Sequence, residues 1–330
     1  MQGFVVQPGG LRCGGTGRLA VGCRNRRDIW RLVPRASVND DPLVQTGAGE
    51  GKVVFGSLEA DDFRHPLDTV ATKMMSRILG VDILVRSLLS PAVEQALFLE
   101  NISTGVLVGP KQLPKIHDQL LEACEVLRIT NIPELYIKQN PLPNAYTLAI
   151  NGRKPFIVVH TSLVELLTPE ELQAVIAHEL GHLKCEHGVW LTLANLIMLF
   201  SNAILGDYAN VLLENMRSNV LRWLRSAELS CDRAALLVAQ DPKIVISMMM
   251  KLAGGSTKLS KELNVEEYMK QAQMYEKATS TQLGSMLRRS QTDYLTHPLP
   301  ILRVVEIEKF AESGKYRKLL REGRKANLNG

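Results

Sequence analysis

A well-capped helix is the feature that most constrains how this chain folds. Thr168 has a side chain that can cap a helix, Pro169 suits the first helical turn, and Glu171 completes a capping box with Thr168. We therefore expect a helix to run forward from Pro169. Residues 174–188, AVIAHELGHLKCEHG, continue this helix and carry two histidines four residues apart.

The histidine pair belongs to the pattern HExxH, formed here by His178, Glu179 and His182. Residues four apart lie on one face of a helix, so both imidazoles can reach one zinc ion at about 2.0 to 2.1 Å. Glu179 is not well placed to bind the same ion, but it can accept a proton from a water that the ion activates. The pattern therefore predicts metal-assisted hydrolysis.

A catalytic zinc ion usually has three protein ligands, so the third has to come from another part of the chain. The extended pattern HExxHxxGxxH fails, because Cys185 stands in place of the glycine and Gly188 in place of the last histidine. This excludes the metzincin arrangement. His187 follows His182 by five residues and points away from the ligand face of a continuing helix, so we expect it at the surface or at the helix end.

Among the acidic residues that follow, Glu228 has the most suitable context, in the sequence LRSAELSCDRAALLVA (224–239). Glu228 and Asp232 are four residues apart on one helical face. The first can bind the ion, and the second can accept a hydrogen bond from a histidine ligand and set its tautomer. The same spacing fits an ordinary solvated helix face, in which Asp232 pairs with Arg233 or Arg225. Spacing alone does not separate these two interpretations.

Three segments together resemble the gluzincin zinc metallopeptidase family that includes HtpX and the CAAX prenyl proteases. They are NAYTLAINGRKPFIVVHTSLVELLTPEELQAVIAHELGHLKCEH, SAELSCDRAALL and LTHPLPILR, within roughly residues 130 to 305. The resemblance implies one zinc ion per chain. It also implies the roles of five residues: the zinc ligands are His178, His182 and Glu228, the general base is Glu179, and Asp232 supports a ligand.

The resemblance also implies where a substrate binds. Asn144, Ala145 and Tyr146 match an edge strand along which a substrate backbone would add by strand pairing. His297 matches a His-Pro segment near the metal and would stabilise the oxyanion or cap the zinc, while Arg303 would anchor this segment. Without the resemblance, His297 is a turn residue before two prolines. The other His-Pro pair, at residues 65–66, has no matching context.

The predicted fold class is α+β, mostly α. Helical spacing covers residues 111–129, and two stretches, 134–150 and 154–160, have strand-like patterns joined by an Asn-Gly turn signal at 151–152. With the resemblance, this predicts a zincin-like metallopeptidase with the HExxH helix beside a small antiparallel sheet, and with an apolar helical insert. The expected domain spans residues 61–330, with an N-terminal helical part (61–128), a catalytic core (129–310) and a C-terminal tail (311–330).

Residues 1–36 differ in composition from the rest of the chain. They contain seven arginines, one acidic residue and no long apolar run, which predicts an organelle transit peptide rather than a secretory signal. Residues 33–37, VPRAS, resemble chloroplast processing sites and favour a plastid over a mitochondrion; the alternative is a disordered basic tail. A flexible linker is expected at residues 37–60. Because the remainder of the chain carries a formal charge of −1, no nucleic-acid-binding surface is expected.

The insert at residues 188–206 has no charged residue. Its length is close to the roughly 20 residues of a membrane span, but four Thr, Ser and Asn residues weaken its hydropathy. Residues 211–225 carry an apolar stripe with arginines beside it, as in a helix at a lipid interface. Three interpretations stay open: a membrane-spanning helix, a hairpin on a lipid surface, and a buried helix of a soluble enzyme. In the second, residues 188–225 bind a lipid monolayer or membrane surface.

Together these features predict a zinc metalloendopeptidase that hydrolyses peptide bonds of plastid proteins at a lipid surface. Its partners would be protein or peptide substrates. The resemblance extends to plastid members of the family, which implies a chloroplast location at the plastoglobule or thylakoid. The alternative is a zinc-stabilised, lipid-associated scaffold or chaperone-like module that does not cut peptides.

Overall fold

A computed structural model describes residues 52–76, 91–148, 154–188, 191 and 207–325 of the 330 residues. The expected transit peptide, most of the expected linker and the Asn-Gly turn at 151–152 lie outside the described residues. Nearly all of the apolar insert lies outside them as well. Predictions about these segments stay predictions.

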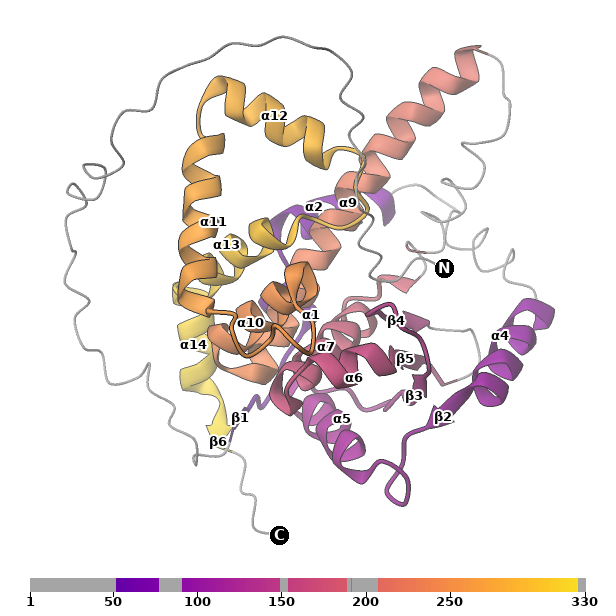
Figure 1. The fold of residues 1–330 in the computed structure, drawn as a ribbon. Coiled ribbons are helices and arrows are strands. Elements are labelled where there is room, and N and C mark those ends of the chain that lie inside the picture. Colours follow the sequence, from indigo (N-terminus) through magenta and orange to yellow (C-terminus); the bar gives the residue numbers. More distant parts are fainter. Residues whose placement is uncertain (1–51, 77–90, 149–153, 189–190, 192–206, 326–330) are drawn as a thin grey trace. The chain divides into compact units, whose positions relative to one another are not determined.

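The described chain is mostly helical with a small sheet, as the sequence predicts (Figure 1). The helices before the insert are α1 (Ala60–Phe63), α2 (Pro66–Ser76), α4 (Pro91–Thr104), α5 (Pro114–Val126), α6 (Thr161–Leu166) and α7 (Pro169–Lys184). Those after it are α9 (Asp207–Ala239), α10 (Pro242–Gly254), α11 (Val265–Thr279), α12 (Gln282–Thr292), α13 (Pro300–Ala311) and α14 (Gly314–Glu322). The strands are β1 (Val53–Val54), β2 (Gly105–Leu107), β3 (Glu134–Lys138), β4 (Ala145–Leu148), β5 (Phe156–His160) and β6 (Arg324–Lys325).

The main sheet is mixed, so the expectation of an antiparallel sheet is wrong in part. Its strand order is β2-β3-β5-β4; β2 pairs antiparallel with β3, and β4 pairs antiparallel with β5, but β3 and β5 run parallel. The reason is that β5 enters the sheet between β3 and β4, the two strands that precede it. The chain reverses its direction between β3 and β4 and again between β4 and β5, so β5 runs parallel to β3. Strand β4 is thereby left at an edge of this sheet.

Helix α7 lies at the centre of the domain, between the sheet and α10 (Figure 1). It begins at the expected residue, because Thr168 and Glu171 form the capping box: the Glu171 amide donates to Thr168 Oγ1 at 3.3 Å, and the Thr168 amide donates to Glu171 Oε2 at 2.8 Å. All residues from Glu171 to His182 are buried. Polar side chains on a helix that is buried on every side need hydrogen-bond or ion-pair partners. The histidines and glutamates of α7 therefore require specific neighbours.

Helix α9 packs against α7 more extensively than any other described element does. It includes the segment SAELSCDRAALL, in which the Ala residues, Cys231, Leu236 and Leu237 are buried together with Glu228 and Asp232. Helix α10 completes this side of the core with the buried stripe Met248, Met249 and Met250. Within the described residues, no helix combines the length and the hydropathy that crossing a membrane requires.

The two ends of the domain differ from the expectation. Residues 52–60, expected in the flexible linker, contribute the buried side chains Phe55 and Leu58 to the core, and β1 pairs antiparallel with β6. The expected C-terminal tail contains α14, whose Tyr316 is buried. The local sequence does not show this, because the two paired strands are about 270 residues apart and each is too short to have a strand pattern.

Candidate metal centre

The two histidines of the HExxH pattern and Glu228 converge where α7 meets α9. His178 Nε2 lies 3.4 Å from Glu228 Oε2, and His182 Nε2 lies 3.4 Å from Glu228 Oε1. Ligands held about 2.0 to 2.1 Å from one zinc ion at tetrahedral angles are about 3.3 to 3.4 Å apart. The carboxylate is therefore spaced from both imidazoles as it would be around a shared ion. All three side chains are buried.

Glycine at position 181 allows the two helices to approach this closely. A Cβ atom placed on Gly181 would lie 3.0 Å from the Cβ of Ala234 and 3.0 Å from the Cα of Cys231, both on α9. These contacts are with the rigid part of the facing helix, which cannot move aside as a flexible side chain can. Gly181 thus lets α9 bring Glu228 within reach of the histidines.

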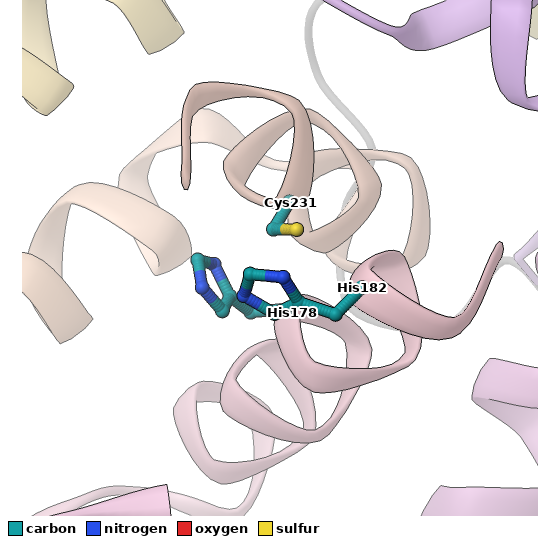
Figure 2. A group of neighbouring side chains, drawn as sticks. All are labelled: His178, His182 and Cys231. Atoms are coloured by element: carbon teal, nitrogen blue, oxygen red, sulfur yellow. The ribbon is translucent and has the colours of Figure 1, made fainter. Parts of the chain in front are cut away.

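Cys231 is a second candidate ligand from α9. Figure 2 shows the rings of His178 and His182 side by side on α7, with Cys231 on the facing helix; the ligand atoms of the three lie within 4.8 Å of one another. However, Cys231 Sγ lies 3.7 Å from Nδ1 of His187, the atom that faces Nδ1 of His182. Burial raises the pKa of the Cys231 thiol well above its usual range, which makes the thiolate that binds metals costly to form. The Nε2 atoms face Glu228 instead, which makes the carboxylate the better third ligand.

His178 is supported from behind by a buried ion pair. Its Nδ1 lies 3.0 Å from Asp232 Oδ1, and Arg303 of α13 donates to both oxygens of Asp232, from Nε at 2.8 Å. Burial alone would raise the pKa of Asp232, but the Arg303 guanidinium outweighs it and lowers this pKa. Burial alone would also lower the pKa of His178, yet Asp232 and Glu228 together raise it to about 9. The structure therefore brings together the five residues His178, His182, Glu228, Asp232 and Arg303.

His297 also reaches this cluster. Its Nδ1 lies 3.0 Å from Glu228 Oε2, and its side chain is 24% exposed, whereas Glu228 is 5% exposed. Burial would raise the pKa of Glu228, but His297 and the two α7 histidines outweigh burial and hold it well below its usual range. The loop before α13 thus places a partly exposed imidazole between the buried cluster and solvent.

Glu179 points toward the sheet edge and has a partner that the sequence analysis missed. The hydroxyl of Thr147, on β4, donates to Glu179 Oε2 at 2.7 Å. Ala145 and Tyr146 belong to β4, the edge strand, and Asn144 precedes it by one residue. The three residues expected along the substrate are thus in or next to the strand that holds Glu179. No local pattern marks Thr147, because its role depends on the approach of β4 to α7.

His187 lies just past the C-terminal end of α7, as one of the two expected positions has it, but it is neither at the surface nor turned away from the ligands, so that part of the expectation is wrong. It is completely buried, with Nδ1 3.2 Å from Nδ1 of His182 and Nε2 3.0 Å from Oδ2 of Asp68. The cause is the way α7 ends: Glu186 adopts φ 56°, in the left-handed region, and the His187 amide donates back to the His182 carbonyl at 3.0 Å. This turn swings His187 behind His182, whereas a continuing helix would carry it away. A non-glycine residue in this conformation is uncommon, so the sequence does not signal the turn.

The fold and these side chains define a metallopeptidase. The model of Peptidase family M48 matches residues 110–311, and the chain belongs to this family of zinc-dependent metallopeptidases. The chain is therefore a metalloprotease, which confirms the expected hydrolase class and the resemblance to HtpX.

Relatives with curated names support the same conclusion. The chain is 52% identical over 277 residues to "Plastoglobule-localized metallopeptidase 48, chloroplastic" of Arabidopsis thaliana, covering 84% of this chain and 80% of that protein. It is 28% identical over 176 residues to "Protease HtpX homolog 2" of Methanosarcina acetivorans, covering 46% of this chain and 60% of that protein. The crystal structure of S. mikatae Ste24p shares 15% identity with this chain, with a TM-score of 0.37, and the match covers 73% of this chain and 61% of that one. The Arabidopsis relative confirms the predicted chloroplast location.

Proposed function

We propose that this metallopeptidase is a zinc endopeptidase that hydrolyses peptide bonds of plastid proteins at a lipid surface. One zinc ion per chain is held by His178, His182 and Glu228 in a zincin-like arrangement of α7, α9 and the sheet edge. The observation that carries the proposal is the placement of each Glu228 oxygen 3.4 Å from a different histidine Nε2. Two imidazole nitrogens and one carboxylate oxygen are a donor set that catalytic zinc sites use, with one position left for water or substrate.

Zinc bound there would polarise the scissile carbonyl and lower the pKa of a water toward about 7. Glu179 is the general base: its carboxylate accepts a proton from the attacking water and returns it to the leaving amine. The hydroxyl of Thr147 holds Glu179 Oε2 by a hydrogen bond of 2.7 Å. This bond keeps the carboxylate in one orientation while its protonation state changes.

His297 acts at the open side of the cluster. As the partly exposed imidazole beside Glu228, it is suited to donate a hydrogen bond to the oxyanion, or to cover the ion when substrate is absent. Arg303 acts on the other side, since its ion pair with Asp232 holds the carboxylate that supports His178. Replacing His297 by Ala separates its two roles: loss of kcat with unchanged zinc affinity indicates oxyanion stabilisation.

The substrate backbone would bind along β4. This strand pairs with β5 on one side and is the last strand of its sheet within the described residues, so its other side is suited to offer backbone groups to an added strand. Asn144, Ala145 and Tyr146 would then hold the peptide in extended form beside Glu179. Strand pairing uses the peptide backbone, so it would accept many sequences.

The proposal also covers the parts of the chain outside the described residues. Residues 1–36 would direct the protein to the chloroplast, with processing near Ala36 and residues 37–51 as a linker. Residues 188–225, of which 189–190 and 192–206 lie outside the described residues, would contact a lipid monolayer or membrane surface through side chains other than the buried Val220, Leu221 and Trp223. The name of the Arabidopsis relative supports a plastoglobule as that surface.

The test is Glu179→Gln in the purified mature chain, incubated with an unfolded protein substrate. The variant should bind zinc with the stoichiometry of the wild type, while cleavage falls by at least about 10²-fold, because only the proton acceptor is lost. Glu228→Ala should lower zinc occupancy. Cleavage by Glu179→Gln at the wild-type rate would refute the assigned base. A wild-type chain that binds zinc but cuts nothing would favour the scaffold or chaperone-like alternative.

A further inference from the structure

A second buried chain of hydrogen bonds lies behind His182. Nδ1 of His182 lies 3.2 Å from Nδ1 of His187, and Nε2 of His187 lies 3.0 Å from Oδ2 of Asp68. His187 and Asp68 are both completely inaccessible to solvent. Asp68 belongs to α2, so this chain ties the metal-facing helix to an element more than a hundred residues earlier.

The protons in this chain have one consistent arrangement. A neutral His182 that binds a metal through Nε2 carries its proton on Nδ1 and donates it to the nearest acceptor, Nδ1 of His187. His187 then carries its own proton on Nε2 and donates it to the Asp68 carboxylate. Each donor faces one acceptor, so each imidazole is fixed in one tautomer.

His187 and Asp68 are themselves held in place. Asp68 Oδ2 also accepts from Ser230 at 2.6 Å, and Asp68 Oδ1 accepts from Thr72 at 2.9 Å. The Trp223 ring lies edge-on to His187, with centroids 5.8 Å apart, and its Nε1 donates to Thr72 at 3.1 Å. These contacts come from α2 and α9, so rotation of the His187 ring would break its hydrogen bond to Asp68 and its ring contact with Trp223.

We propose that His187 and Asp68 are positioning residues for zinc binding, acting through His182 as Asp232 and Arg303 act through His178. This inference rests on the proposed role of His182 as a ligand. His187 accepts the Nδ1 proton of His182, which directs the Nε2 lone pair toward Glu228 and the ion. The carboxylate of Asp68 orients His187 and makes it a better acceptor. Each histidine ligand thus has its own two-residue support: Asp232 of α9 with Arg303 of α13 for His178, and His187 after α7 with Asp68 of α2 for His182.

The same atoms do not favour a second metal ion. Asp68, Cys185 and His187 offer ligand atoms within 4.8 Å of one another. Asp68 Oδ2, however, is already engaged by His187 and Ser230, and burial raises the pKa of the Cys185 thiol to about 12. The Arg64 guanidinium donates to the Cys185 carbonyl at 3.0 Å, which places a positive charge beside the group. A hydrogen-bonded positioning pair accounts for these contacts and a cation does not.

The experiment compares His187→Phe with His187→Gln in the mature chain. Phe fills the space but accepts no proton, so zinc affinity, measured by competition with a chelator, should fall about 10- to 100-fold. The absorption bands of the Co²⁺-substituted protein should shift, because they report ligand geometry. Gln can accept from His182 through its amide oxygen and donate to Asp68, so His187→Gln should recover most of the affinity and the wild-type spectrum.

The matched control is Lys251→Met, which breaks a buried ion pair with Glu171 at the other end of α7. Glu171 is eleven residues before His182, or about 16 Å along the helix. This variant should lose stability but keep zinc affinity and the cobalt spectrum. If His187→Phe does not fold, Asp68→Asn replaces it, with the same expected direction and a smaller loss.

Three results would overturn the inference: wild-type zinc affinity and spectrum in His187→Phe, equal losses of affinity in His187→Phe and Lys251→Met, or no recovery in His187→Gln. Two zinc ions per wild-type chain, with one lost in His187→Phe, would replace it by a second metal site. Failure of the proposed function is distinguishable, because then Glu228→Ala would bind zinc as the wild type does.

Discussion

The replacement Gly181→Ala tests whether the closeness of α7 and α9 is what forms the metal centre. The added Cβ would meet Ala234 Cβ and Cys231 Cα at 3.0 Å each, whereas carbon atoms prefer about 3.5 to 4.0 Å. The helices would have to separate by about 0.5 Å. Overpacking of this kind costs about 1 to 3 kcal/mol, and the better helix propensity of Ala returns about 1 kcal/mol. The expected net loss of stability is therefore about 0 to 2 kcal/mol.

The effect of Gly181→Ala on zinc should be larger than its effect on the fold. Zinc sites keep their ligand distances within about 0.2 Å, so a shift of about 0.5 Å in α9 would take Glu228 out of the required geometry. We expect zinc affinity to fall at least about 10-fold, a change comparable with losing a supporting partner. The assays are urea unfolding of the metal-depleted protein and chelator competition for zinc.

The matched control is Gly254→Ala in α10, where an added Cβ has no atom within 4 Å. This variant should keep zinc affinity and be as stable as the wild type, or slightly more stable. If Gly181→Ala matched Gly254→Ala in both assays, the argument from helix approach would be refuted.

Three further predictions follow from the buried polar groups. Arg303→Met leaves Asp232 buried without its cation and should cost about 3 to 5 kcal/mol in urea unfolding; a loss below about 1 kcal/mol would contradict the ion pair's role. Burial alone would raise the pKa of Asp68, but the hydrogen bond from His187 outweighs it and lowers this pKa from 3.8 to about 2. The ionised carboxylate therefore adds about 2 kcal/mol to the stability of the fold above about pH 4, and this contribution is lost as the pH falls through 2. Asp68→Asn should flatten acid unfolding of the metal-depleted protein between these values, and an unchanged profile would argue against it. Thr147→Val should retain the fold and bound zinc but lower kcat on an unfolded protein substrate about 10-fold. The reason is that Glu179 loses an orienting hydrogen bond of about 1 to 2 kcal/mol. An unchanged kcat would remove Thr147 from the mechanism.

Much of the site could be predicted because its signals are local. The capping box at Thr168 sets where α7 begins, and helical spacing puts His178 and His182 on one face of it. The same spacing groups Glu228 with Asp232 on α9. Each of these inferences needs only the geometry of one helix.

The failures have a common physical cause. His187 was expected at the surface or at the helix end and turned away from the ligands, because the helix was continued past Glu186, where the backbone in fact enters the left-handed region and turns back. The sheet was expected to be antiparallel because neighbouring strands in sequence were paired with each other, whereas β5 lies between β3 and β4. Both errors extend a local pattern across a point where a distant packing partner decides the path of the chain.

The local sequence was thus enough to predict the start of α7, the helical faces on which His178, His182, Glu228 and Asp232 lie, and the chemical class of the protein. Which of those faces meet follows from packing in three dimensions: Gly181 allows α9 to lie against α7, Thr147 reaches Glu179, and Asp68 and His187 lie behind His182. The reason is one of range. The geometry of a helix repeats every few residues and depends on neighbours in sequence. Contacts between elements depend instead on side-chain volumes and on turns contributed by residues far apart in the chain.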